Sequence, residues 1–156
     1  MKDMIKKLIQ PFAVVFSHVL RRPHTIQYPY ERLVIPSNYR GRHVLDMEKC
    51  VGCGVCARIC PNNCITLVPV GGRRFKHPQI DYGRCSFCEM CVRYCPHDAL
   101  SMIDFVELSA TSREELIYPP QKLAEIPSVK EALPQLKKEL TVEVTESGIR
   151  YIRRKV

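Results

Sequence analysis

Two stretches of sequence decide the fold: "CVGCGVCARICP" at residues 50–61 and "CSFCEMCVRYCP" at residues 85–96. Both follow the pattern C-x2-C-x2-C-x3-C-P, and the second begins 35 residues after the first. The match extends beyond the cysteines, because Leu45-Asp46 corresponds to Ile80-Asp81 at the same offset. Self-similarity at a fixed offset indicates an internal repeat, so we expect two equivalent halves.

The spacing within each motif predicts how the thiols are used. Four thiolates can surround a metal or a metal cluster, and the three cysteines of C-x2-C-x2-C come from one loop that is too short to serve different centres. The fourth cysteine is expected at the start of a short helix, pointing away from that loop. It therefore serves another site, and in a duplicated chain that site is the centre of the other half.

The doubled pattern resembles that of bacterial two-cluster ferredoxins, in which the fourth cysteine binds the other cluster. This resemblance implies two [4Fe–4S] clusters. The predicted ligands of the first cluster are Cys50, Cys53, Cys56 and Cys95, and those of the second are Cys85, Cys88, Cys91 and Cys60. Structural zinc is disfavoured because it usually takes two C-x2-C pairs separated by a longer gap. Disulfides are disfavoured because the spacing draws neighbouring thiols to one point.

The residues between the cysteines differ in the two loops. Gly52 and Gly54 let backbone amides approach the inorganic sulfides, which accept hydrogen bonds. The second loop has Phe87 and Glu89 at these places, and Phe87 is expected to shield its cluster. Hydrogen bonding and burial tune cluster potentials, so we expect the two potentials to differ.

Other residues beside the motifs are given structural roles. Cys64, the ninth cysteine, corresponds to Ala99 in the repeat and is predicted to pack in the core. His77 and His97 are expected at the surface or as capping residues, because each predicted cluster already has four thiolates. Two matching arginines lie either on a solvated helix face or near enough to neutralise part of the cluster charge. They are Arg58 and Arg93.

The composition limits the classes of function. The chain of 156 residues has a formal net charge of +8, with +6 in residues 1–44, zero in residues 45–108 and +2 in residues 109–156. A basic N-terminal part suits a membrane surface or a partner protein. Nucleic acid is not an expected partner, because the chain has no Trp and no alternation of aromatic and basic residues. An odd cysteine count, with no recognisable signal peptide or membrane-spanning segment, predicts a reducing compartment.

The repeat predicts an α+β fold with a pseudo-twofold, bacterial-ferredoxin-like core. Each half is expected to contain a short strand, a ligand loop, a short helix with the fourth cysteine and another short strand. The predicted parts are an amphipathic helix at 1–22, an extended docking arm at 23–44, the two-[4Fe–4S] domain at 45–108 and a tail at 109–156. No nucleophile–base pair, phosphate loop or paired-carboxylate site is evident. We therefore expect a non-catalytic chain that transfers electrons.

Elements outside the core are predicted from periodicity. Apolar residues of segment 1–22 fall on one helical stripe, and Pro11 is expected to kink the helix or divide it in two. "SVKEALPQLKKEL" (128–140) is predicted to be helical, interrupted by Pro134. Residues 141–155 alternate around Ser147-Gly148 and predict a hairpin. Ser112, followed three residues later by Glu115, predicts a helix cap.

Beyond the cysteines, the sequence resembles the two-cluster ferredoxin-like subunit of respiratory complex I and its relatives. "TIQYPYERLVIPSNYRGRH" (25–43) resembles the arm of that subunit, and "TSREELIYPPQKL" (111–123) resembles the segment after its second motif. A short connection, "VLDMEKC" (44–50), and the tail after residue 125 bring the chain closer to compact relatives. These are the membrane-bound hydrogenases, the sulfane-sulfur reductases and related archaeal complexes.

The resemblance implies an electron relay at the cytoplasmic side of a membrane. The implied partners are the subunit that holds the terminal cluster, a large hydrogenase-like subunit and a membrane-embedded subunit, with residues 1–22 against the membrane surface. One alternative is an independent soluble ferredoxin, and another is a docking scaffold whose clusters are only structural. The arm and helix favour the relay, because a small diffusing carrier needs no such 44 preceding residues.

Overall fold

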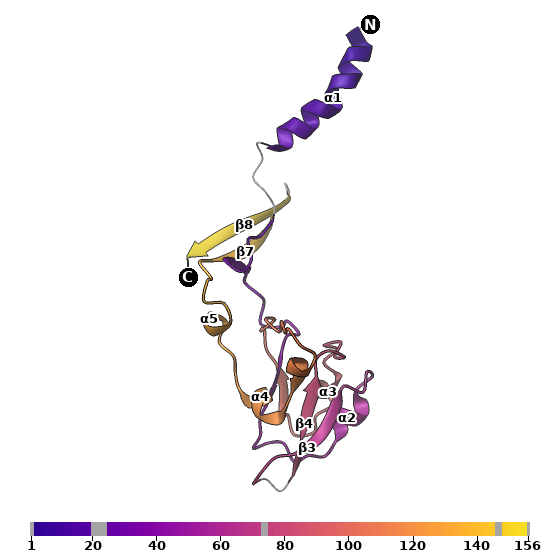
Figure 1. Ribbon diagram of the computed structural model, residues 1–156, viewed down its shortest axis with the longest axis vertical. Coiled ribbons are helices and arrows are strands. Elements are labelled where there is room, and N and C mark those ends of the chain that lie inside the picture. Colours follow the sequence, from indigo (N-terminus) through magenta and orange to yellow (C-terminus); the bar gives the residue numbers. More distant parts are fainter. Residues whose placement is uncertain (1, 20–24, 73–74, 146–147, 156) are drawn as a thin grey trace.

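The computed structural model describes residues 2–19, 25–72, 75–145 and 148–155. Figure 1 shows helix α1 (Lys2–Val19) at one end of the molecule and the cysteine-bearing core at the other. A small sheet that contains both β7 (Lys138–Thr145) and β8 (Gly148–Lys155) lies between them (Figure 1). The fold is therefore an α+β core with attachments formed by both ends of the chain.

The core strands pair across the two halves of the repeat. The first strand of each half pairs antiparallel with the last strand of the other, which places Leu45 opposite Leu100 and Ile65 opposite Ile80. All four side chains are buried. The strands are β2 (His43–Leu45) with β5 (Leu100–Met102), and β3 (Ile65–Pro69) with β4 (Lys76–Asp81). Neither half forms its own sheet, so the core depends on both halves together.

Each half carries one short helix, and this helix holds the third cysteine of the motif. Cys56 lies within the first helix and Cys91 within the second, whereas Cys60 follows the last residue of its helix. The prediction that the fourth cysteine begins a helix is therefore wrong. Proline disfavours helical backbone in the residue before it, and Cys60, which precedes Pro61, is extended with ψ 115°. The two helices are α2 (Val55–Ile59) and α3 (Met90–Arg93).

The segment after the second motif completes the core. Tyr118 pairs with Ile80 at the edge of β4, and Leu123 is fully buried where the following helix packs on β2 and β4. The carboxylate of Glu115 accepts hydrogen bonds from the hydroxyls of Thr111 and Ser112. The predicted helix cap at Ser112 is wrong, because Arg113 is the residue before the 3-10 helix and no side chain caps that helix. The elements are η1 (Glu114–Leu116), β6 (Ile117–Tyr118) and α4 (Pro120–Ala124).

The second sheet joins the arm to the tail. Its order is β1-β7-β8, with β1 (Glu31–Leu33) parallel to β7 and β8 antiparallel to β7. The two strands of the predicted hairpin are present, and Ser147 of its turn lies outside the described residues. The helix predicted over 128–140 is mostly wrong: only α5 (Val129–Ala132) is α-helical, and β7 begins at Lys138. Pro134 cannot continue a helix, and β1 supplies backbone partners for the strand.

The arm is fixed to the core by a buried ion pair. Arg32 of β1 donates from Nε to a carboxylate oxygen of Glu107 at 2.6 Å, and both side chains are less than a tenth exposed. Within the sheet, Arg153 of β8 lies 3.1 Å from the carboxylate of Glu31. These contacts hold a segment that was predicted only as extended, and that contributes β1 and β2.

α1 is amphipathic and its apolar face is open to solvent. It runs through Pro11 as one helix, so of the two expected effects of Pro11, a kink or a division, the division into two helices is wrong. The exposed apolar side chains on the predicted stripe are Ile5, Leu8, Ile9, Phe12, Val15, Phe16 and Val19. Among the described residues, no helix combines the length and apolar character that crossing a membrane requires.

Replacing Arg32 with Ala tests the anchor of the arm. The variant leaves the buried Glu107 carboxylate without its partner, so we expect the free energy of unfolding to fall by about 3–5 kcal/mol. Lys138→Ala is the control, because Lys138 is half-exposed and lies 3.9 Å from Glu31, and it should cost less than about 1 kcal/mol. Denaturant unfolding measures both, and equal losses would contradict the role of the buried pair.

Candidate functional site

Two small cavities lie within the core, and cysteine thiols line both. The first is lined by Cys50, Cys53, Cys56 and Cys95. The second is lined by Cys60, Cys85, Cys88 and Cys91. Each cavity thus combines three cysteines of one motif with the fourth cysteine of the other, which is the grouping that the sequence predicts.

The repeat relates the two cavities residue by residue. Apolar side chains complete both walls, with Leu100 at the first cavity and Ile65 at the corresponding position of the second. Among the described residues, no three His, Cys, Asp or Glu side chains come together as a site for a single metal ion. The four thiols of each set instead surround a space, and this arrangement fits a multi-iron cluster that takes one thiolate at each iron.

The ligand loops hold the same unusual backbone conformation with different residues. Gly52 and Gly54 have φ values of 67° and 76°, and Phe87 and Glu89 have φ values of 53° and 68° at the corresponding places. Non-glycine residues seldom adopt this left-handed conformation, and they need support from surrounding contacts. The loop shape is therefore kept in the second half at a cost in local strain.

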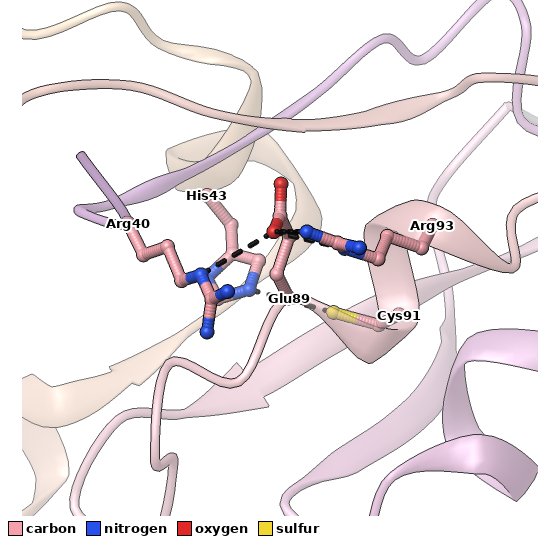
Figure 2. A network of polar contacts seen from close by, with 5 residues as sticks. All are labelled: Arg40, His43, Glu89, Cys91 and Arg93. Atoms are coloured by element: carbon pink, nitrogen blue, oxygen red, sulfur yellow. Dashed lines mark hydrogen bonds and ion pairs between the residues drawn. The ribbon is translucent and has the colours of Figure 1, made fainter. Parts of the chain in front are cut away.

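Specific contacts support the strained residues of the second loop. Figure 2 shows the Glu89 carboxylate between Arg40 and Arg93, at 3.3 Å from Arg40 Nε and 3.0 Å from Arg93. The ring of Phe87 stacks on Tyr82, with centroids 5.5 Å apart. The contact between Arg40 and Glu89 also ties the N-terminal arm to the second ligand loop.

Backbone amides donate to the sulfurs in both halves. The amide of Cys64 lies 3.5 Å from Cys60 Sγ, and the corresponding amide of Ala99 lies 3.3 Å from Cys95 Sγ. In the second loop, the amide of Phe87 lies 3.4 Å from Cys85 Sγ. Such N–H···S contacts stabilise a metal-bound thiolate.

Burial acts against thiolate formation in the absence of iron. It raises the pKa of Cys56 to about 11 and that of Cys91 to about 12. Neighbouring cysteines raise the pKa further, and Cys56 of the first half contributes to the shift of Cys91 in the second. These thiols are therefore protonated at neutral pH, and binding a cluster must release their protons.

The remaining residues near the motifs lie as follows. Cys64 is buried as predicted, with its sulfur 3.3 Å from Cys60 Sγ. Exposed Arg58 reaches the carbonyl of Cys53, and His97 is exposed at the first cavity. His77 was expected at the surface, and this is wrong: it is buried in β4, and neither ring nitrogen has a hydrogen-bond partner. Its strand lies between β3 and β6, which a sequence pattern does not reveal.

Two residues were not singled out from the sequence: His43, which lines the second cavity, and Tyr82, which contacts His43. His43 is 1% exposed, lines this cavity, and has Nε2 3.4 Å from Cys91 Sγ. Burial lowers the pKa of His43 to about 4, which keeps the ring neutral at neutral pH. Tyr82 contacts both the ring and the backbone of His43. The sequence offered one indication that His43 lies near the second site, because it stands two residues before Leu45, where the repeat match begins.

Comparisons with known proteins agree with this geometry. Residues 49–99 match the model of the 4Fe-4S dicluster domain, and the cofactors are accordingly two [4Fe–4S] clusters. NAD(P)H-quinone oxidoreductase subunit I of Prochlorococcus marinus (strain MIT 9303) is 46% identical over 131 residues, which cover 81% of this chain and 60% of the relative. The corresponding subunit of Trichodesmium erythraeum (strain IMS101) is 44% identical over 131 residues, 78% of this chain and 61% of the relative.

A solved structure extends the likeness to a respiratory assembly. A chain of the archaeal membrane-bound sulfane sulfur reductase, a respiratory membrane complex, aligns with a TM-score of 0.56 and 33% identity. The alignment covers 85% of this chain and 76% of that one. The chain spans about 60% of the length of the curated relatives that it matches.

Replacing Gly52 with Ala tests the need for the left-handed loop. A Cβ at this position would overlap the carbonyl oxygen of Lys76, in addition to a backbone cost of roughly 1–2 kcal/mol. We expect a lower thermal midpoint and loss of iron from the first cluster. Gly72→Ala is the matched control, because Gly72 has φ 77° with no atom within 4 Å of an added Cβ. Equal effects of the two substitutions on iron content would contradict the prediction.

Proposed function

Because this chain belongs to the family of two-[4Fe–4S] ferredoxin-like subunits of complex I and related membrane-bound respiratory complexes, we propose that it is an electron relay within such a complex. It performs no substrate chemistry itself and passes electrons towards the subunit that holds the terminal cluster. The observation that carries the proposal is the pair of cysteine-lined cavities, each built from both halves of the core.

The proposed ligand sets follow the lining of the cavities. Cys50, Cys53, Cys56 and Cys95 hold the first cluster, and Cys85, Cys88, Cys91 and Cys60 hold the second. When bound, each cluster accepts and releases one electron at a time. The chain supplies the thiolates, the amide donors and an apolar wall that limits the access of water.

The packing of the two helices supports transfer between neighbouring sites. α2 and α3 are in contact, and each carries the third cysteine of its motif. Cys56 also contributes to the raised pKa of Cys91, which supports a short distance between the two proposed sets. Two adjacent sites of this kind are suited to moving electrons from one partner to another.

Helix α1 supports a place beside the membrane. Phe12 at the centre of its apolar stripe is 61% exposed, and Phe16 is 70% exposed. An exposed stripe of this kind stabilises binding to a lipid surface or to a membrane-embedded partner. We propose a peripheral position on the cytoplasmic side, with the terminal-cluster subunit, a large hydrogenase-like subunit and a membrane-embedded subunit as neighbours.

An independent soluble ferredoxin is the second candidate. It would use the same ligands and the same core. The stripe on α1 and the sheet of β1, β7 and β8 favour the relay within a complex, because a diffusing carrier has no use for an apolar helix that its own core leaves uncovered.

Replacing Cys95 with Ala tests the crossed ligand sets. Cys95 belongs to the second motif, but it lines the first cavity, so the first cluster should be lost or altered. Paramagnetic resonance of the reduced, anaerobically purified chain identifies which signal disappears. Cys60→Ala is the reciprocal variant and should affect the second cluster. If each variant instead removes the cluster of its own motif, the crossed assignment is wrong.

Replacing Phe12 with Glu tests the role of α1. A charge in the middle of the stripe should release the chain from the membrane fraction, because burying it in an apolar contact is unfavourable. Gln10→Glu is the control, since it adds the same charge to the opposite face of the same helix. Membrane fractionation and co-purification of partner subunits measure the effect, and retention of the Phe12→Glu chain in both assays would reject the proposed contact.

A further inference from the structure

A buried histidine lines the second cavity, whereas the histidine at the first cavity, His97, is exposed. His43 lies at the start of β2, is almost fully buried and places Nε2 3.4 Å from Cys91 Sγ (Figure 2). At an offset of 35 residues, the corresponding residue is Pro78, which is also fully buried and lines the first cavity. Proline has neither a side-chain donor nor a backbone N–H, so Pro78 donates nothing to Cys56, which accepts instead from the backbone of Ala57.

The hydroxyl of Tyr82 contacts His43 at two points. It accepts a hydrogen bond from the backbone N–H of His43 at 2.9 Å, and it lies 3.3 Å from Nδ1 of the same residue. A hydroxyl carries one proton, which it can donate to Nδ1. With Nδ1 accepting, the proton of the neutral ring sits on Nε2, the nitrogen that points at Cys91.

The imidazole is held in place from several sides. Its ring centroid lies 5.7 Å from that of Tyr82 and 6.1 Å from that of Phe87, and these two rings stack on each other. Three residues before His43, Arg40 pairs with Glu89 in the ligand loop of Cys91 (Figure 2). The positions of His43 Nε2 and Cys91 Sγ relative to each other are therefore held both by side-chain contacts and by the backbone.

We propose that His43 is a positioning residue that donates from Nε2 to the Cys91 thiolate and makes the second cluster the one with the higher reduction potential. Hydrogen bonds to the sulfurs of a cluster raise its potential, because they offset the negative charge that reduction adds. Electrons entering the chain then reside preferentially at the Cys60, Cys85, Cys88 and Cys91 site. This inference rests on the proposed function.

Potentiometric titration followed by paramagnetic resonance tests the inference on the full chain, purified anaerobically with its iron. The signal of the second cluster is the one altered by Cys60→Ala. In His43→Leu, the ratio of reduced to oxidised cluster at a fixed potential should fall roughly tenfold, equal to about 59 mV for a one-electron couple. The midpoint of the first cluster should not move, and His43→Gln, which keeps an N–H donor, should recover part of the shift.

Two further variants separate hydrogen bonding from packing. Tyr82→Phe removes the hydroxyl that contacts Nδ1, so a smaller shift in the same direction is expected. His77→Leu removes an equally buried imidazole that contacts no cysteine sulfur, and should leave the second midpoint unchanged. Where His43→Leu does not fold, the Tyr82→Phe result decides.

The outcomes that overturn the inference differ from those that overturn the relay. An unchanged second midpoint in folded His43→Leu, or an equal fall in His43→Gln, shows that His43 does not act as a donor. In either case both clusters still titrate reversibly, and the relay remains supported. If neither cluster of the unmodified chain titrates reversibly, the proposed function fails before the role of His43 is reached.

Discussion

Each cysteine-lined cavity is closed by a thiol from the opposite half of the core, and the remaining structure depends on this exchange. The strands follow the same rule, because β2 pairs with β5 and β3 pairs with β4. Backbone pairing and thiol placement therefore join the same two halves. Under the proposed ligand sets, removing one cluster releases a fourth cysteine in the other half, so the stability of both sites is linked.

The local part of this arrangement could be predicted from the sequence. The short C-x2-C-x2-C spacing leaves three thiols little choice of position. The repeat located the first strand of each half, around Leu45 and Ile80, but not the strands with which they pair. The helix position was missed by a few residues, because the effect of Pro61 on the backbone of Cys60 outweighed the expected helix start. The two sets of cysteines could be grouped in advance, while the contacts around them could not.

Contacts between distant segments account for the rest. Lys138 to Leu140 carry a helical pattern, yet they form a strand because β1, about a hundred residues earlier, provides a parallel partner. His77 is buried in β4, the middle strand of its sheet. His43 contacts Cys91, which lies 48 positions later in the chain. Periodicity in the sequence indicates which residues share a face of one element, and it does not indicate contacts between distant segments. A comparison of His43 with Pro78, which stands 35 residues later, would have pointed to His43 as a difference between the two halves.

The two halves keep the same backbone and differ in chemistry. Left-handed residues occur at matching places in both loops, but glycine provides them in the first loop, whereas Phe87 and Glu89 need aromatic and ionic support in the second. Two identical sites would have equal reduction potentials, and an electron would prefer neither. Different side chains on a common backbone can make the potentials unequal and so give a relay a direction. Arg40 and His43 both come from the arm, where Arg40 contacts Glu89 of the second loop and His43 contacts Cys91 of α3. The arm thus contributes to the environment of one site, and under the proposed function residues 40–43 would couple assembly to electron distribution.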